Sequence, residues 1–256
     1  MNLDKPTTMS PLFTARVGGF CWLMCFLTSG FAMSIATKLI VQRDPAATAA
    51  NLLAKEALYQ ISTAALLISG AFYIGATFFI YEVLKPVNAR LSLLAALFSL
   101  VGCAIGAVAC LFDVVPFILL KGSHFAAVFT TEQLQALTLM FLNVRAQANN
   151  IGLVFFGLHC FGVGYLIFRS TFLPRAIGAL MMFAGIGWLT FLYPPLANSL
   201  APFNMMPGGI GELSLTLWLL VKGVNVDRWN EEARMAAEWH PAAGLHSSPL
   251  ARRACL

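Results

Sequence analysis

The sequence is poor in charged residues, and this scarcity excludes an ordinary soluble domain. Asp, Glu, Lys and Arg make up 11% of its 256 residues, whereas they form about a quarter of a typical soluble protein. Hydrophobic residues reach 59%, and the mean hydropathy is +0.78. Such a chain needs lipid as its solvent. Its length suits one bundle of about six helices, because each crossing takes roughly 20 residues.

The motifs of the familiar enzyme classes are also missing. The chain has no GxxxxGK[ST] phosphate loop, no HExxH, no GxSxG and no CxxC pair. His159 and Cys160 are adjacent, so they point to different faces of a helix and make poor ligands for one metal ion. Haem would lack a second axial ligand, because only one histidine lies deep in an apolar segment. We therefore expect no enzyme, no metal and no cofactor.

Clustered basic residues and paired cysteines are likewise absent. The net charge of +5 comes from residues spread along the loops, without the interleaved aromatics of a nucleic-acid site. Five of the six cysteines lie in apolar segments and the sixth, Cys255, lies in the tail, so no disulfide framework is indicated. The sequence thus predicts no nucleic-acid partner, and the partner that it does predict is the lipid bilayer.

Stretches without charge place the membrane spans. The stretch over residues 176–211 is too long for one helix, and its prolines divide it. The sequence therefore predicts six spans, at residues 17–37, 57–81, 91–112, 146–168, 176–193 and 208–221. The expected fold class is all-α, a polytopic membrane protein with six transmembrane helices and short extracytoplasmic helices. Residues 1–16 would form a cytoplasmic segment, 17–223 the transmembrane domain and 224–256 a cytoplasmic polar tail.

The distribution of basic residues predicts the orientation. With the N-terminus inside, eleven of the sixteen Lys and Arg residues lie on the cytoplasmic side and five lie outside. This asymmetry favours a multi-pass protein of a bacterial inner membrane with both termini in the cytoplasm.

Capping signals predict further helices outside the membrane. Asp44 and Pro45 form an N-cap followed by an N1 proline, which indicates a helix over 46–58. A capping box at 130–133 indicates an outer helix reaching about Arg145. After residue 225 we expect a brief amphipathic helix over 227–239 and then disorder.

Two predicted spans carry stripes of small or polar residues. In the span 91–112 and just beyond it, the stripe contains Ser99, Gly102, Gly106, Cys110 and Asp113. We interpret it as a packing seam built on a GxxxG pair, with Asp113 as a cap near the outer surface. In the span 57–81, the stripe contains Tyr59, Thr63, Gly70, Tyr73, Thr77 and Tyr81. Either its outermost tyrosines anchor the helix at the two membrane surfaces, or Tyr73 and Thr77 line a polar cavity.

Two ionisable residues lie deep in the predicted membrane. His159 and Glu212 each stand ten residues before a basic residue that ends the span, so both lie about 15 Å from the inner boundary and could pair. The span 208–221 is only about 21 Å long, which indicates a broken helix with Glu212 in its first turn. The alternative is structural: a neutral, hydrogen-bonded His159, and a Glu212 that satisfies backbone NH groups and bonds Thr216.

Three runs of sequence resemble a known family. They are ARVGG at 15–19, IGLVFFGLHCFGVGYLIFRSTFLPRAIG at 151–178 and GELSLTLWLLVKGV at 211–224. Over about residues 15–224 the chain resembles the bacterial membrane proteins of the domain-of-unknown-function 4386 family. This resemblance implies a multi-span inner-membrane protein and brings no activity, substrate or catalytic residue.

Three classes of function remain open. The leading hypothesis is a non-enzymatic protein that binds a lipid or small amphiphile in a polar cavity of the bundle, or acts with a partner protein. The candidate binding residues are His159, Glu212, Thr216, Tyr73 and Thr77. The alternative is a proton-coupled transporter or channel that uses Glu212 and His159. An intramembrane enzyme ranks third, because no nucleophile and base pair is visible.

Overall fold

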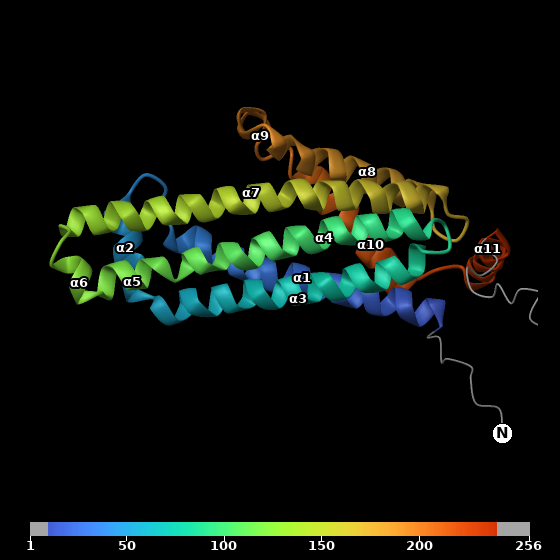
Figure 1. Cartoon of the computed structure of the whole chain (residues 1–256), viewed down its shortest axis with the longest axis horizontal. Coiled ribbons are helices and arrows are strands. Elements are labelled where there is room, and N and C mark those ends of the chain that lie inside the picture. The colour runs from blue at the N-terminus through green and yellow to red at the C-terminus, as the bar shows by residue number, and fades with distance from the viewer. Residues whose placement is uncertain (1–9, 240–256) are drawn as a thin grey trace, which may run out of the picture.

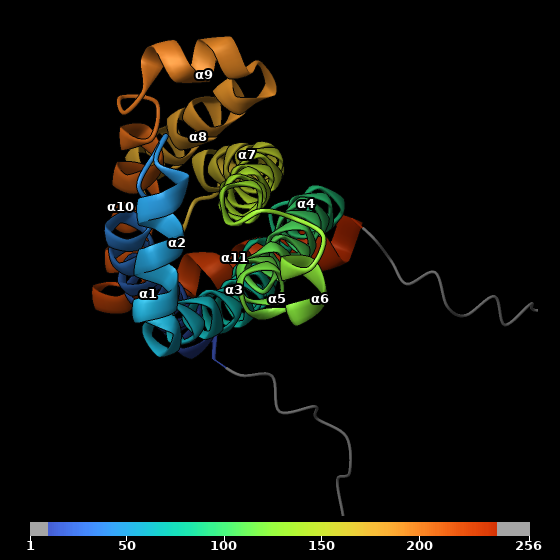
Figure 2. The ribbon, with the colours of Figure 1, turned by 90° about the vertical axis from the view of Figure 1, so that its left-hand side faces the viewer.

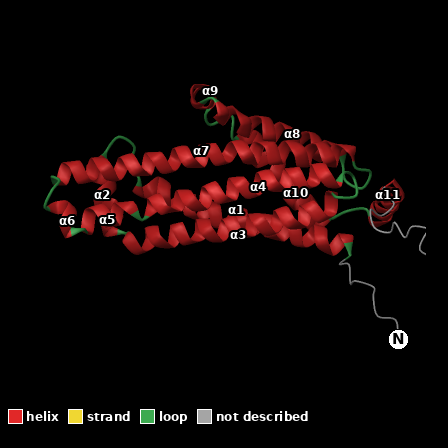
Figure 3. Cartoon of the chain, in the orientation of Figure 1, coloured by secondary structure: helices red, strands yellow, loops and turns green. Residues whose placement is uncertain are grey.

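The computed structural model describes residues 10–239, and helices and loops account for all of this part of the chain (Figure 3). Six helices are long: α1 (Pro11–Leu39), α3 (Glu56–Leu84), α4 (Ala89–Ala109), α7 (Thr131–Arg169), α8 (Arg175–Leu189) and α10 (Met206–Val221). The others are α2 (Pro45–Ala54), α5 (Val115–Lys121), α6 (Ser123–Ala126), α9 (Pro194–Leu200), α11 (Val226–Trp239) and the 3₁₀ turns η1 (Cys110–Asp113) and η2 (Thr190–Leu192). The disorder expected after residue 239 lies outside the described residues.

Five helical stretches are long and apolar enough to cross a membrane. They are Pro11–Leu39, Glu56–Leu84, Ala89–Lys121, Thr131–Arg169 and Arg175–Leu192. The sixth predicted span, α10, has only 16 residues, and α11 continues from it at an angle of 104°. The all-α membrane fold is therefore confirmed with five to six spans, and α10 is as short as its sequence indicates.

The capping signals are confirmed, but one of the helices that they open is much longer than expected. Asp44 Oδ1 accepts a hydrogen bond from Ala47 N at 2.9 Å at the start of α2. Thr130 and Gln133 form the capping box of α7. This helix then runs for 39 residues without a break, so the predicted outer helix and the fourth span are one helix. Its length of about 58 Å exceeds the thickness of the hydrocarbon core, so part of α7 must lie beyond that core.

The long helices lie side by side along one axis (Figures 1 and 2). α1 packs against α3 and α10, whereas α7 packs against α4 and α8. Glycines bring α7 and α8 into backbone contact: a Cβ on Gly164 would lie 2.5 Å from Met182 N, and one on Gly178 would lie 2.6 Å from Phe168 N. Such contact replaces the hydrophobic effect as a source of helix association in lipid.

The amphipathic helix predicted over 227–239 is confirmed as α11, which lies across the end of the bundle where α1 begins (Figure 1). Trp229 Nε1 donates to Val83 O at 2.9 Å, which fixes α11 to the end of α3. Thr171 Oγ1 donates to Glu232 Oε2 at 2.8 Å, which fixes α11 to the loop between α7 and α8. α11 therefore links the end of α3 to the loop between α7 and α8 at the same end of the molecule.

Candidate functional site

A cavity of about 480 Å³ lies among α1, α3, α4 and α7. Its walls are mostly apolar, and α10 contributes Glu212 to them. Residues that characterise the walls are Phe26, Leu66, Tyr73, Cys103, Leu153 and Phe156. Binding sites for small molecules usually have this size and this mixture of many apolar and few polar groups.

The cavity opens between α3 and α4. Thr77 and Ser99 share a hydrogen bond of 2.6 Å that joins these antiparallel helices. Gly70 precedes Thr77 by seven residues on α3, and Gly106 follows Ser99 by seven residues on α4. Because the helices are antiparallel, the two glycines lie at the same level, and a Cβ on either would meet no atom within 4 Å. Leu67 also lines the cavity and is 49% exposed, so the cavity reaches the lipid-facing surface. We infer that the cavity opens between these two glycines.

The predicted packing seam on α4 is therefore only half correct. Gly102 does pack against a neighbouring helix, since its Cβ would lie 3.0 Å from the Phe156 ring of α7. Gly106, one turn further on, faces the cavity instead. The GxxxG spacing identified an inward face, but it did not distinguish a helix contact from a void.

Glu212 is held by side chains from three other helices. Its Oε1 accepts a hydrogen bond from Trp188 Nε1 at 2.8 Å and a weak one from Cys160 Sγ at 3.5 Å, and its Oε2 accepts one from Trp22 Nε1 at 3.3 Å. Glu212 is 7% exposed, and its carboxyl group joins α10 to α8, α7 and α1. These donors replace part of the hydration that a buried carboxyl group loses.

The expected position of Glu212 at a helix start is wrong. α10 begins at Met206, two residues earlier than predicted, so Glu212 lies in the second turn. Its partners are consequently indole and thiol groups, and not the free backbone NH groups of a first turn. Thr216 Oγ1 does bond to Glu212, but to its backbone oxygen, at 2.8 Å.

His159 does not pair with Glu212. Its Nδ1 donates to Ala95 O of α4 at 2.9 Å, and no hydrogen bond or ion pair within residues 10–239 joins it to Glu212. Successive helical residues are about 100° apart, so Cys160 faces α10 where His159 faces α4. Trp22 lies between the two groups: it donates to Glu212, and its ring centroid is 6.3 Å from that of His159.

Tyr73 and Thr77 have different surroundings. Tyr73 lines the cavity, and its buried hydroxyl has no hydrogen-bond partner among the described residues. The Thr77 hydroxyl is hydrogen-bonded to Ser99, and Thr77 lies outside the cavity. Of the five predicted site residues, the structure therefore brings Tyr73 and Glu212 to the cavity and places the other three, Thr77, His159 and Thr216, in helix packing.

The opposite end of the cavity holds a charged group that the sequence analysis missed. Arg145 lines the cavity, and its Nε lies 2.7 Å from Asp113 Oδ1 in an ion pair. Tyr59 OH donates to the same oxygen at 2.5 Å. Asp113 is therefore a buried ion-pair partner and not the interfacial cap that we expected. The spacing of Arg145, Asn149, Leu153 and Phe156 along one helical face is the pattern from which this end could have been identified.

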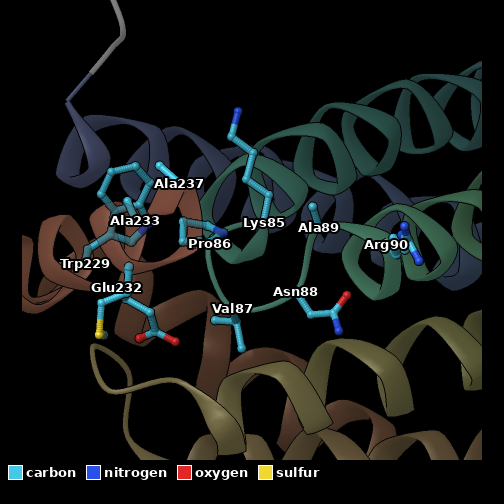
Figure 4. Close-up of a pocket in the computed structure, with 12 residues that line it drawn as sticks. Lys85, Pro86, Val87, Asn88, Ala89, Arg90, Trp229, Glu232, Ala233 and Ala237 are labelled. Carbon is cyan, nitrogen blue, oxygen red and sulfur yellow. The ribbon is translucent and has the colours of Figure 1, made fainter. Parts of the chain in front are cut away.

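A second hollow of about 670 Å³ lies on the surface between α11 and the turn that joins α3 to α4 (Figure 4). Two of its charged groups already have partners within the chain: Lys85 pairs with Glu82 at 2.5 Å, and Glu232 accepts from Thr171. Trp229, Met235 and three alanines form the rest of its α11 side. This hollow supports no specific recognition, and the cavity within the bundle is the candidate site.

Metal binding finds no support in the part of the chain that the structure describes. No group of three His, Cys, Asp or Glu residues there is arranged to hold a metal ion.

Comparisons with known proteins identify a family but no activity. The family model described as "Domain of unknown function (DUF4386)" matches residues 17–223. An uncharacterized protein of Archaeoglobus fulgidus is 26% identical over 146 residues, which cover 56% of this chain and 72% of that protein. No solved structure matches the chain.

Proposed function

We propose that this chain, which belongs to the DUF4386 family of proteins of unknown function, is a non-enzymatic membrane protein that binds a lipid or small amphiphile in the cavity among α1, α3, α4 and α7. The observation that carries the proposal is the gap between Gly70 and Gly106, which connects an apolar cavity to the lipid-facing surface. An acyl chain can enter there without crossing water. Tyr73 contributes to the wall of this cavity, although its hydroxyl oxygen is enclosed by the protein.

Filling the opening tests this proposal. A leucine at Gly106 would project into the cavity, whereas one at Gly30 of α1, where a Cβ also meets no atom within 4 Å, would lie outside it. Proteins are extracted in mild detergent, and the lipids that co-purify are identified by mass spectrometry. We expect wild type and Gly30→Leu to retain an enriched lipid, and Gly106→Leu to retain about tenfold less of it, as an overpacking cost of 1–3 kcal/mol implies.

Two results would contradict ligand binding in the cavity. One is a wild type that carries only bulk lipid in bulk proportions. The other is an equal lipid content in the Gly106→Leu and Gly30→Leu proteins.

The proposal includes a location in a bacterial inner membrane with both termini in the cytoplasm, supported by the distribution of Lys and Arg. In that orientation α11 lies on the cytoplasmic side and Lys121 outside. We expect green fluorescent protein fused after Trp239 to fluoresce and alkaline phosphatase fused after Lys121 to be active. The reversed pattern would contradict the orientation and every depth derived from it.

A proton-coupled transporter or channel is the second candidate. The observation in its favour is that Glu212 lines the cavity, which brings a titratable group within reach of the opening. Because His159 does not touch Glu212, any coupling between the two would be indirect, through neighbours such as Trp22 or Cys160. Comparing the stability of wild type and Glu212→Gln at pH 5 and at pH 8 separates this candidate from simple binding.

A further inference from the structure

Arg145 stands at the outer end of the cavity. It precedes Arg169, the last residue of α7, by 24 residues, or about 36 Å along the helix. If the inner boundary of the hydrocarbon lies near Arg169, Arg145 is at the level of the outer lipid headgroups, because the hydrocarbon core is about 30 Å thick. Glu212 lies deeper, about 14 Å before the end of α10. The cavity therefore extends from the headgroup level toward the middle of the membrane.

The guanidinium of Arg145 is fixed in place, yet part of it remains free. Nε faces Asp113 Oδ1, and Tyr59 holds that same carboxylate oxygen from the other side. No hydrogen bond within residues 10–239 involves the two terminal nitrogens of Arg145. Asn149 lines the cavity one turn further along α7, and its side-chain amide is a second donor on the same face.

Resting on the proposed function, we infer that the ligand is an amphiphile with an anionic headgroup, a carboxylate or a phosphate, which binds Arg145 and Asn149 while its acyl chain occupies the apolar cavity. A planar guanidinium with two free nitrogens suits either anion, because it donates two parallel hydrogen bonds. Asp113 orients Arg145 through Nε and leaves the two terminal nitrogens to the anion.

The test compares headgroups on one chain length. The probes are palmitate, 1-palmitoyl-lysophosphatidylglycerol and the neutral 1-palmitoylglycerol, each titrated into protein in dodecyl maltoside while thermal stabilisation is measured. The double variant Asp113→Asn with Arg145→Gln removes both charges and keeps an acceptor oxygen for Tyr59. The matched control, Glu56→Gln with Lys121→Gln, removes another ion pair that joins α3 to α5 and lies outside the cavity.

The apparent affinity of each probe is compared between wild type and variant in the same detergent, so the partitioning of the probe into micelles affects both values equally. In the Arg145 double variant we expect the apparent affinity for at least one anionic probe to fall about tenfold and that for 1-palmitoylglycerol to change less than twofold. The control variant should bind all probes as wild type does. The anionic probe that loses affinity identifies the headgroup as a carboxylate or a phosphate.

Two outcomes would overturn the inference alone: wild type binds the neutral and anionic probes equally well, or the double variant keeps the anionic preference. If no probe stabilises wild type, the proposed function fails and this inference fails with it. Unchanged binding of 1-palmitoylglycerol shows in the same experiment that the double variant is folded.

Discussion

Glu212→Ala is expected to destabilise the protein by about 3 kcal/mol, because it leaves two indole NH groups in the bundle without an acceptor, each at a cost of about 1–3 kcal/mol. Trp22 is 1% exposed, and Glu212 is the hydrogen-bond partner of its indole NH. Trp188 makes the shorter bond, at 2.8 Å. The change also detaches α10 from α1 and α8, two helices on which its position depends. Unfolding in detergent, followed by tryptophan fluorescence, measures the effect.

A double-mutant cycle shows whether the loss arises from this network. Trp188→Phe removes the nearer donor, so it should lower the free energy of unfolding less in the Glu212→Ala background than in wild type. Glu212→Gln keeps one carbonyl oxygen and should fall between wild type and Glu212→Ala. A Glu212→Ala protein as stable as wild type would mean that the carboxyl group is not needed for packing.

The same variants decide between binding and proton coupling. The difference in stability between wild type and Glu212→Gln is measured at pH 5 and at pH 8. A transporter that uses Glu212 requires this carboxyl group to exchange its proton in that range, so the difference must change with pH. An equal difference at both values would contradict the transporter candidate and leave the binding proposal unaffected.

The positions of the membrane spans follow from where charge is absent, but the continuity of α7 does not. α7 was expected to be divided near Arg145, since a charged residue beside Ala146 marks the end of an apolar stretch. In the structure Asp113 neutralises Arg145, and the helix continues past it. Charge alone therefore marks a helix end only where no partner of opposite charge lies on a neighbouring element.

The depth of a residue along its helix could be derived from the sequence, whereas the direction in which its side chain points could not. Residue counts place His159 and Glu212 at similar distances from the ends of their helices, but the rotation of each helix decides which side chains meet. Cys160 takes the place that we assigned to His159. The two indoles that hold Glu212 come from helices 190 and 24 residues away in sequence, and no spacing rule joins them.

The contact between α7 and α8 was also missed, although its pattern is visible. Gly157 and Gly164 on α7 and Gly178 and Gly185 on α8 are each seven residues apart. A Cβ on Gly185 would lie 2.7 Å from Gly157 O, so each pair meets backbone to backbone. A repeat of seven returns to the same helical face, and two matching repeats on successive helices predict a close crossing.

Gly164→Ala is therefore expected to destabilise the protein by about 1–3 kcal/mol, the cost of overpacking a tight contact. The new methyl group would lie 2.5 Å from Met182 N and 2.7 Å from Gly178 O, and backbone atoms cannot move aside as the end of a side chain can. The helices must separate, and the separation shifts Trp188 of α8 away from Glu212. Denaturant unfolding of the purified protein gives the change in free energy.

Gly70→Ala is the matched control, because it is the same substitution in a span where a Cβ meets nothing within 4 Å. Alanine is the better helix former by up to about 1 kcal/mol, so Gly70→Ala should be neutral or stabilising. If the contact between α7 and α8 depends on the absence of a methyl group, Gly164→Ala lowers the free energy of unfolding, whereas Gly70→Ala leaves it unchanged or raises it. Equal effects on stability would show that α7 and α8 are not held by backbone contact, and the position of Trp188 over Glu212 would then need another explanation.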